Sequence, residues 1–499
     1  MTKQHAYITT AIPYVNGKPH IGNALDYLLA DIWARYQKQN GHEVRFQVGT
    51  DEHGNKIAAK AQANGLDPQG YVDSMYGNFK VLMEAVGAEY TDFIRTTDPH
   101  HVAAVQYIWQ RLAQAGLIYK HTYEGWYCVG HEAFFTDKEV HETNGICPDH
   151  QTPYERVSEE NYYLKASAFT EQIRQAITEG RMKIVPEFRK NEFLELIKNG
   201  VQDVSISRPR KTLSWGVPVP GDDSQVMYVW LDALANYITV LGYPDRADEW
   251  QAYWPADVQV IGKDILRFHA GIWPAMLLGL DLPLPKTLLV HGFVHVGGSK
   301  MSKTVGNVVD PMEIIQSYGA DAFRYFFARH IPTQDDGDFT WEKFEKAYNG
   351  ELGNDLGNLV QRVAAMLTRY QAGVIGDAPQ AEHDMTIYRD MMQRLEFDKA
   401  LDEVWSSVRS LNQYLERVKP WEIAKRRATD HDAESHLSEV LAYAASTLLQ
   451  IADEIVPFMP ATAQAIHTIF GTGVVPADTP PLFPKRYIHT PDPRARAAS

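Results

Sequence analysis

The sequence predicts an α/β protein, in which a parallel sheet is interrupted by an insertion and followed by an α-helical bundle. Two observations support this fold class. Short β-rich runs alternate with longer helical runs between residues 6 and 115, and the alternation resumes after residue 225. From about residue 340 strand-like runs nearly vanish, and helical runs follow one another to about residue 470. Alternating strands and helices are typical of parallel sheets, and successive helices form bundles.

The first unit starts with a strand, a helix and a second strand. Residues 6–11 and 43–49 are rich in residues that favour strands. Residues 22–40 repeat apolar side chains at helical spacing, which predicts a helix with one buried face. We therefore assign residues 1–116 to the first half of a Rossmann-like domain.

An insertion is expected at residues 117–225, where Gly, Pro, aromatics and short strand-like runs replace the β/α alternation. The alternation resumes with residues 226–231, a strand leading into a helix. Residues 258–261 are typical of a buried strand, and residues 265–278 have the composition of the helix that follows it. Residues 226–299 are thus predicted to complete one sheet built from two separated halves.

The last third of the chain is predicted to be helical. Residues 300–349 follow the sheet, and residues 350–472 are assigned to the helical domain. Helical runs are expected at residues 358–370, 395–418 and 436–455. Residues 473–499 are rich in Pro, Asp and Arg, and we expect this C-terminal tail to wrap the surface or to stay mobile.

Composition and charge exclude several classes of protein. The chain has 63 acidic and 48 basic residues and a formal charge of −15, whereas nonspecific nucleic-acid binding depends on cations that neutralise phosphates. Its apolar stretches are well short of the roughly 20 residues that span a bilayer, and no basic and apolar leader opens the chain. We expect a cytoplasmic protein with no membrane contact.

Two cysteines are too few for a disulfide framework, which leaves a metal site or inert thiols.

Two short stretches, almost three hundred residues apart, predict a split phosphate site. After the first strand, His20, Gly22 and Asn23 open the helix, where Gly22 lets a nucleotide approach the backbone and the helix dipole favours an anion. Lys300 and Lys303 lie on a Gly-rich loop that also follows a strand-like run. Two mobile ammonium groups suit the negative charge that accumulates in a phosphoryl transition state. Folding would have to bring the two stretches together.

With these stretches the chain resembles the class I aminoacyl-tRNA synthetases, and among them the methionyl-tRNA synthetase family, from Tyr7 to about residue 470. Further stretches of the resemblance are Pro13-Tyr14-Val15-Asn16-Gly17, Gly49-Thr50-Asp51-Glu52-His53-Gly54, Val229-Trp230-Leu231-Asp232-Ala233, Ile261-Gly262-Lys263-Asp264 and Lys419-Pro420-Trp421. The chain departs from the family at Asn23, where His is more frequent, and at Thr304, where Ser is more frequent. Asn keeps a donor but not the option of positive charge, and Thr keeps the hydroxyl.

The resemblance implies ATP-dependent activation of L-methionine to methionyl-adenylate and its transfer to the 3′-terminal adenosine of tRNA(Met), including initiator tRNA. It implies Mg²⁺ with the ATP. His20, Asn23, Lys300 and Lys303 would stabilise the developing charge, with Gly22, Lys263 and Asp264 completing the ATP site. Residues 300–349 would carry the lysine loop and contact the tRNA stem. The helical domain would read the anticodon through Asn358, Arg362 and Trp421, because aromatic and guanidinium planes stack on unpaired bases.

The methionine pocket also follows from the resemblance. Methionine offers a flexible thioether that is only a weak acceptor, so a selective pocket must combine apolar shape with a few placed donors. The residues assigned to it are Ile12, Tyr14, Asp51, Trp230, Ala233, Leu234, Tyr237, Ile265 and His269. In this assignment Asp51 binds the substrate ammonium, and Tyr14 and His269 donate toward the sulfur.

Both cysteines lie in the insertion and begin a Cys-x-x-His pair: Cys128 with His131, and Cys147 with His150. Two such pairs would close a tetrahedral zinc site with two sulfur and two nitrogen ligands. Four protein ligands leave no open position, which predicts a structural Zn²⁺. The methionyl-tRNA synthetase family commonly carries a zinc knuckle here, often with cysteine at the position of His131.

Three alternatives remain open at this point. Cysteinyl-tRNA synthetases hold their substrate with zinc in the catalytic pocket, and no cysteine lies in that region here. Small nucleotidylyltransferases share the first signature but have no long helical domain. A tRNA-binding paralogue without activity would not need Asp51 or the two lysines. Relatives that dimerise through an additional C-terminal domain are longer than this chain, so a monomer is expected.

Overall fold

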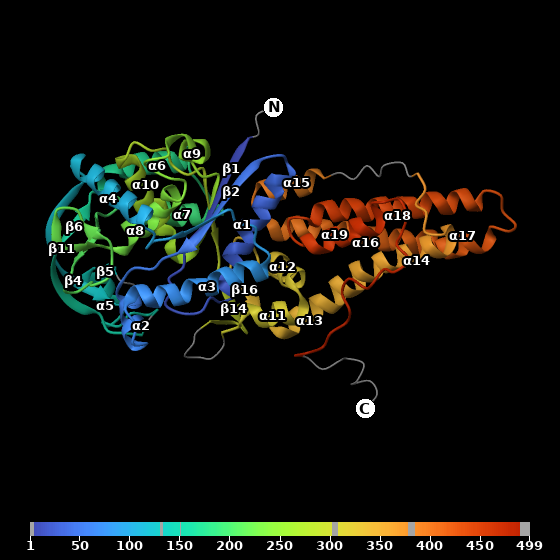
Figure 1. The fold of residues 1–499 in the computed structure, drawn as a ribbon, viewed down its shortest axis with the longest axis horizontal. Coiled ribbons are helices and arrows are strands. Elements are labelled where there is room, and N and C mark those ends of the chain that lie inside the picture. The colour runs from blue at the N-terminus through green and yellow to red at the C-terminus, as the bar shows by residue number, and fades with distance from the viewer. Residues whose placement is uncertain (1–3, 130–132, 150, 302–307, 378–384, 490–499) are drawn as a thin grey trace.

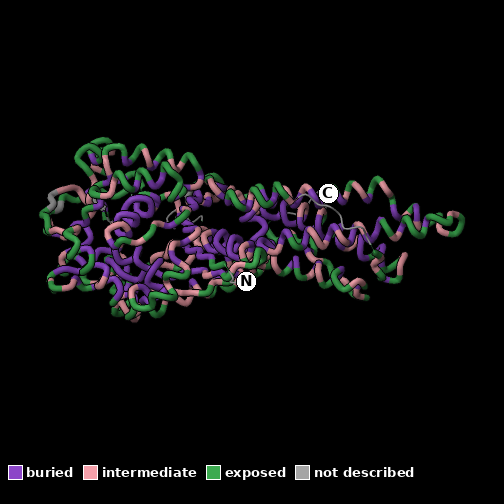
Figure 2. The backbone as a smooth tube through the Cα atoms, turned by 90° about the horizontal axis from the view of Figure 1, so that it is seen from above, coloured by how far each residue is buried: buried purple, intermediate pink, exposed green. Residues whose placement is uncertain are grey.

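The computed structural model describes residues 4–129, 133–149, 151–301, 308–377 and 385–489. The molecule is elongated, with the α/β part at one end and the helical bundle at the other (Figure 1). One cluster of buried apolar side chains extends from the first strand into the bundle. The buried residues in Figure 2 follow the same long axis. The two parts therefore share packed side chains and are not joined by a linker alone.

A six-stranded parallel sheet forms the centre of the α/β part, in the order β3-β2-β1-β12-β13-β7. Its strands are β1 (His5–Thr10), β2 (Glu43–Thr50), β3 (Asp92–Arg95), β7 (Lys183–Val185), β12 (Val258–Gly262) and β13 (Thr287–His291). The two predicted halves join where Ile8 of β1 pairs with Val258 of β12. The expectation of one parallel sheet built from separated halves is confirmed.

Helices cover both faces of this sheet. Alternate residues of β1 point into different cores: Ala6 and Ile8 pack with α1 (Ile21–Gln39) and α3 (Pro68–Val86). Tyr7 packs with the other core, which contains residues of α4 (Pro99–Gln114), α8 (Val229–Thr239) and α10 (Trp273–Gly279). Successive side chains of a strand point to opposite faces, so a strand covered on both sides is buried throughout.

The structure differs from the predicted insertion at residues 117–225. Its middle part returns to the central sheet, because β7 pairs with β13 through Ile184 and Leu288. The flanking helices α6 (Thr170–Thr178) and α7 (Glu187–Leu196) contribute to a core that also contains residues of β12 and β13. A strand of three residues between two helices is too short to produce a visible β pattern, which is why the sequence did not reveal it.

The rest of the insertion forms two small antiparallel sheets. The larger has the order β5-β4-β6-β8 and contains β4 (Ile118–Cys128), β5 (Ala133–Phe135), β6 (Glu155–Leu164) and β8 (Val204–Ser205). The smaller has the order β10-β11-β9, with β9 (Ser207–Pro209), β10 (Pro218–Val219) and β11 (Asp222–Met227). The strand predicted within residues 226–231 overlaps β11 only at Val226 and Met227, and β11 belongs to this antiparallel sheet and not to the parallel one.

The helix predicted at residues 265–278 is divided. It begins with the short turn η2 (Lys263–Ile265), continues as the π-helix η3 (Phe268–Ile272) and ends as α10. In the π segment the N–H of Trp273 donates to the carbonyl of Phe268, five residues earlier. Pro274 follows and has no N–H for the carbonyl of Ala270, so the regular α-helical pattern cannot continue through this point.

After the sheet the chain crosses to the helical bundle. The connecting elements are β14 (Val294–Val296), β15 (Ser299–Lys300), α11 (Pro311–Tyr318), α12 (Ala320–Arg329), β16 (Gly337–Phe339), α13 (Trp341–Ala347) and η4 (Tyr348–Gly357). The bundle contains α14 (Asn358–Gln371), α15 (Thr386–Gln393), α16 (Phe397–Val418), α17 (Pro420–Arg426), α18 (Ala433–Ile455) and α19 (Pro460–Phe470). Three of these confirm the predicted helices to within three residues at either end.

The described part of the tail after α19 packs back on η4. Tyr348 donates to the carbonyl of Pro484 at 2.9 Å, and Asn349 donates to the carbonyl of Arg486 at 2.6 Å. This agrees with the expectation that the tail wraps the surface. Among the helices of the described ranges, none has the length and apolar character required to cross a membrane.

Candidate active site

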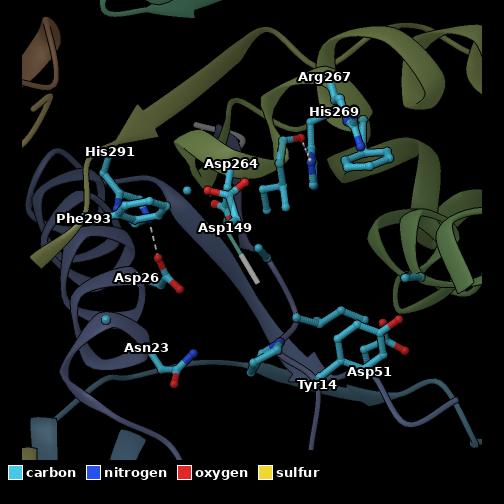
Figure 3. A pocket seen from close by; sticks show the side chains of 18 of the residues that line it. Tyr14, Asn23, Asp26, Asp51, Asp149, Asp264, Arg267, His269, His291 and Phe293 are labelled. Carbon is cyan, nitrogen blue, oxygen red and sulfur yellow. Dashed lines mark hydrogen bonds and ion pairs between the residues drawn. The ribbon is translucent and has the colours of Figure 1, made fainter. Parts of the chain in front are cut away.

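A cavity of about 1130 Å³ opens at the carboxyl end of the parallel strands (Figure 3). This edge is where open α/β sheets bind ligands, at the point between β1 and β12 where the strand order reverses. All nine residues assigned to the methionine pocket line this cavity, together with His20, Gly22, Asn23 and Asp264 of the expected ATP site. Segments from both halves of the chain therefore meet in one place.

The first of the two stretches that predict the phosphate site, which contains His20, Gly22 and Asn23, forms the start of α1. His20 is the N-cap residue, and its Nδ1 accepts a hydrogen bond from the backbone N–H of Gly22 at 3.1 Å. The side-chain Oδ1 of Asn23 accepts from the backbone N–H of His20 at 3.1 Å, which completes a capping box. An accepting Nδ1 places the imidazole proton on Nε2, and the amide nitrogen of Asn23 remains a donor. Both side chains therefore cap the helix and keep one donor each.

The loop after β2 carries Asp51, which is 4 % exposed. Its backbone is fixed beside the loop after β1, because Asp51 N donates to Pro13 O at 2.9 Å and Val15 N donates to Asp51 O at 3.2 Å. Gly49 precedes the loop, and a Cβ at Gly49 would lie only 2.3 Å from the carbonyl oxygen of Ile94. A side chain there would push the strand away, so glycine is required for this close approach.

A buried network holds the same loop against α8. One carboxylate oxygen of Asp232 lies 2.7 Å from Nδ1 of His53, and the other lies 2.9 Å from Nε2 of His101. The Nδ1 of His101 lies 2.7 Å from the hydroxyl of Thr239. Burial alone would raise the pKa of Asp232, but the two histidines lower it to about 2. Asp232 is thus an ionised carboxylate that connects the Asp51 loop to the helix of the pocket.

His269 differs from its expected role as a donor to sulfur. Its Nδ1 lies 3.0 Å from the carbonyl of Ile265, and its Nε2 lies 2.7 Å from the hydroxyl of Tyr237. Burial lowers the pKa of His269 to about 4, so the ring is neutral and carries one proton. A carbonyl can only accept, which places that proton on Nδ1 and makes Nε2 the acceptor of the tyrosine O–H. In this arrangement Tyr14 is the remaining predicted donor near the sulfur.

An aromatic stack forms one wall of the cavity. The rings of Trp230 and Phe268 are parallel, with centroids 3.6 Å apart. Phe268 and His269 are the first residues of the π-helix, so the irregular turn sets the direction of both side chains. Phe268 was not among the predicted pocket residues, although its spacing from Ile265 and His269 on one helix would have indicated it.

The nucleotide end of the cavity contains Asp264, whose carboxylate folds over Gly262: a Cβ at Gly262 would lie 2.8 Å from Oδ1 of Asp264. Lys263, which was assigned to the ATP site, is not among the residues that line the cavity, and its Nζ binds Asp336 at 2.7 Å. The backbone of Lys300 in β15 pairs with the backbone of His295 in β14. Lys303 and Thr304 lie outside the described residues.

Asp26 and His291 line the cavity and were not predicted.

The insertion also contributes to the cavity. Phe135, Glu139, Asp149 and Tyr154 line it from the side of the insertion that carries the cysteines. Asp149 and Asp264 both line the cavity and are labelled in Figure 3. Nothing in the local sequence of the insertion indicates that it lines the cavity, because this depends on how two sheets are oriented.

The two cysteines are buried in one small cluster with Val140 and Tyr154. Cys128 ends β4, and Cys147 lies in a turn closed by its own N–H donating to Thr152 O at 2.8 Å. Both thiols interact with Tyr154. His131 and His150 lie outside the described residues. Within the described ranges no group of three metal-binding side chains is present.

The predicted anticodon residues lie in the bundle, away from the sheet (Figure 1). Arg362 on α14 forms an ion pair with Glu416 on α16 at 2.6 Å, and its other nitrogen donates to Asn412 Oδ1 at 3.0 Å. Asn358 lies one turn earlier on α14. Trp421 is half-buried on α17, which follows α16 directly. All three are thus carried by helices that meet at this part of the bundle.

The parallel sheet and the cavity at its carboxyl edge define an α/β protein of the class that binds nucleotides at this edge. A helical bundle is added to it. The family model described as tRNA synthetases class I (M) matches residues 6–159 and 150–364. The methionine–tRNA ligase of Caldanaerobacter subterraneus subsp. tengcongensis is 42% identical over 481 residues, covering 94% of this chain and 74% of that protein. The methionine–tRNA ligase of Brucella suis is 40% identical, covering 96% of this chain and 93% of that protein. The chain therefore belongs to the methionine–tRNA ligase family of class I tRNA synthetases.

Solved structures support the same assignment. The structure of Mycobacterium tuberculosis methionyl-tRNA synthetase in complex with methionyl-adenylate has a TM-score of 0.90 and 34% identity, and covers 96% of this chain and 100% of that one. The apo form of the same enzyme has a TM-score of 0.84 and 30% identity, and covers 97% and 99% of the two chains.

Proposed function

We propose that this chain is a methionine–tRNA ligase, which activates L-methionine with ATP and transfers it to the terminal adenosine of tRNA(Met), including initiator tRNA. The observation that carries the proposal is the single cavity that contains all nine methionine-pocket residues and the start of α1. An apolar wall, a buried carboxylate and a helix N-terminus in one cavity suit an amino acid joined to a nucleotide phosphate.

In the first step the methionine carboxylate attacks the α-phosphorus of ATP, and pyrophosphate leaves. Asp51 binds the ammonium group and so fixes the direction of the carboxylate. The Nε2–H of His20 and the amide of Asn23 donate to phosphate oxygens at the N-terminus of α1, where the helix dipole also favours negative charge. Lys300 and Lys303 are assigned to the charge on the departing pyrophosphate. Mg²⁺ enters as the ATP complex and neutralises phosphate charge.

In the second step the 2′-hydroxyl of the terminal adenosine attacks the acyl carbon, and AMP leaves. A phosphate oxygen of the adenylate takes up the hydroxyl proton in this proposal, because no side chain of the predicted site is assigned as a base. The wall formed by Trp230 and Phe268 holds the thioether chain and excludes water from the acyl carbon.

The test is methionine-dependent exchange of pyrophosphate into ATP by the purified full chain. Methionine should stimulate exchange, and cysteine should not. Stimulation by another amino acid, or exchange that needs none, would contradict the assignment. Charging of a tRNA(Met) transcript then tests the second step.

We also propose a structural zinc held by Cys128, His131, Cys147 and His150. The burial of both cysteines in one small cluster supports it, because a structural zinc site needs two sulfur ligands from separate segments in one place. Zinc would clamp the end of the insertion that lines the cavity. Metal analysis should find one zinc per chain, and Cys147→Ala should lose it; a variant that keeps its zinc would rule out this ligand set.

Anticodon reading by Asn358, Arg362 and Trp421 is the third part of the proposal. The ion pair with Glu416 holds the guanidinium of Arg362 in a fixed plane, which suits stacking or paired hydrogen bonds to a base. Arg362→Ala should raise the KM for tRNA while leaving pyrophosphate exchange unchanged. The exposed Arg394→Ala on the same domain serves as the control. Equal effects of the two substitutions on tRNA would exclude a specific role for Arg362.

A further inference from the structure

The two halves of the site meet at a contact between two residues that lie outside both predicted phosphate-site stretches. His291 ends β13, the strand that leads toward the lysine loop, and Asp26 lies on α1, the helix that His20 begins. Nε2 of His291 contacts Oδ1 of Asp26, and their side chains are only 7 % and 16 % exposed. Figure 3 shows this contact at one wall of the cavity, beside Asn23.

Both partners of His291 are acceptors, which favours a proton on each of its ring nitrogens. Its Nδ1 lies 2.8 Å from the carbonyl oxygen of Gly292, which can only accept, so Nδ1 carries a proton. Its Nε2 faces the carboxylate of Asp26, and a second proton is needed there to avoid opposing lone pairs. The ordinary pKa of a carboxyl group is lower than that of imidazole, which places this proton on Nε2. The pair is therefore an imidazolium and a carboxylate.

The other side of His291 is fixed. A Cβ at Gly292 would lie 2.2 Å from the backbone carbon of Asp335, so the chain passes this point without a side chain. The N–H of Phe293 donates to Oδ1 of Asp336 at 2.8 Å, and the same carboxylate binds Lys263. The backbone that follows His291 is therefore held against Asp335 and Asp336.

We infer that the Asp26–His291 ion pair is a positioning contact of the active site, which holds α1 and the strand leading to Lys300 in the arrangement that adenylate formation needs. The inference rests on the proposed function. Both residues line the cavity that contains His20 and Asn23, so a shift of α1 would move the phosphate donors relative to the second half. Loss of the Nε2 proton breaks one of the two contacts of His291, because a neutral ring cannot donate to both acceptors.

The Asp26–His291 ion pair depends on pH in a defined direction. The acidic groups that face His291 are Asp26 on α1 and Asp264 on η2; Lys263 nearby is neutralised by Asp336. Burial by itself lowers the pKa of His291, but these carboxylates and the Gly292 carbonyl raise it above its ordinary value. A raised pKa means that the contact is present at low pH and is lost as the pH rises through that pKa. The loss therefore lies on the alkaline side of about pH 6.5.

The test measures methionine-dependent pyrophosphate exchange by the full chain between about pH 6 and about pH 9, the range that brackets a raised histidine pKa. The wild type should lose kcat/KM for ATP as the pH rises. His291→Asn cannot become a cation, so this decline should disappear and kcat/KM for ATP at neutral pH should fall about tenfold, the effect of one charged hydrogen bond. Asp26→Asn should move the decline to lower pH. His295→Asn, which alters a histidine four residues away that is 31 % exposed, is the matched control and should keep the wild-type profile.

A profile of His291→Asn that parallels the wild type would overturn the inference, as would equal increases in the KM for ATP and for methionine. If the variants do not fold, ¹⁵N NMR of histidine-labelled wild type provides a second measurement. Both ring nitrogens of His291 should be protonated at neutral pH, and a neutral ring would overturn the ion pair. Wild-type protein without exchange activity at any pH would instead reject the proposed function.

Discussion

At the scale of single residues, His269 shows how burial selects one protonation state. Its ring is enclosed between the Ile265 carbonyl and the Tyr237 hydroxyl, and its pKa is lowered to about 4. A charged ring would lose its solvation and would also oppose the tyrosine proton. The residue thus accepts the hydrogen bond that orients the Tyr237 hydroxyl, and it stays neutral at neutral pH.

A pH dependence of stability follows for His269. His269 binds a proton below about pH 6.5 in the unfolded chain, but only near pH 4 in the folded chain. The free energy of unfolding should therefore fall between about pH 6.5 and 4, by up to about 3 kcal/mol. Denaturant unfolding at a series of pH values measures this slope. His269→Gln should reduce it, whereas His431→Gln, on an exposed turn, should leave it intact. An unchanged slope in His269→Gln would mean that the ring is protonated when folded.

At the scale of elements, the π-helix η3 sets the pocket wall. It widens the turn at Phe268 and His269, and Pro274 directly after it prevents a regular α-helix from replacing it. The stack of Phe268 on Trp230 depends on this local irregularity. Helical spacing by itself places Ile265 and His269 on one face but does not reveal the extra residue in the turn.

Replacing Pro274 tests the element. Pro274→Ala supplies an N–H for the carbonyl of Ala270, so the π turn should convert toward an α-helix and rotate Phe268 and His269 out of place. The KM for methionine should rise about tenfold or more, while the free energy of unfolding stays equal or increases. Pro460→Ala, at the start of α19, is the control. A stable variant with normal methionine KM would show that the π-helix does not shape the pocket.

At the scale of the whole molecule, Arg324 joins the α/β part to the bundle. It is fully buried on α12 and binds Asp31 of α1 at 2.7 Å. The same guanidinium donates to Pro457 O and Phe458 O, each at 2.7 Å, just after α18. One planar side chain therefore connects the helix of the phosphate site to the end of a bundle helix, and all its partners are acceptors.

Removing this joint should affect stability and tRNA charging more than amino-acid activation. Arg324→Met leaves Asp31 buried with Arg35 as its remaining ion-pair partner among the described residues, and should lower the free energy of unfolding by about 3–5 kcal/mol. Aminoacylation should fall more than pyrophosphate exchange, because the bundle loses its fixed orientation. Arg246→Met removes an exposed ion pair and should change stability by less than about 1 kcal/mol. Equal losses of exchange and aminoacylation would contradict a role in orienting the bundle.

The sequence by itself determined the split parallel sheet and the helical bundle, and the family resemblance predicted nine residues that line one cavity. Strand and helix periodicity are local properties, so β1, α1, α16 and α18 could be placed from the chain alone. The signature residues were recognisable because nucleotide chemistry requires certain groups at fixed spacing. These predictions needed no knowledge of which segments pack together.

Only the tertiary structure decided which side chains act on one another. The return of β7 to the central sheet, the donors and acceptors around His269, and the Asp26–His291 pair all join segments that are distant in sequence. Lys263, which is predicted to contact ATP, binds Asp336, a residue 73 positions further along the chain. Protonation states in particular follow from burial and from partners in three dimensions, which periodicity and motif spacing do not record.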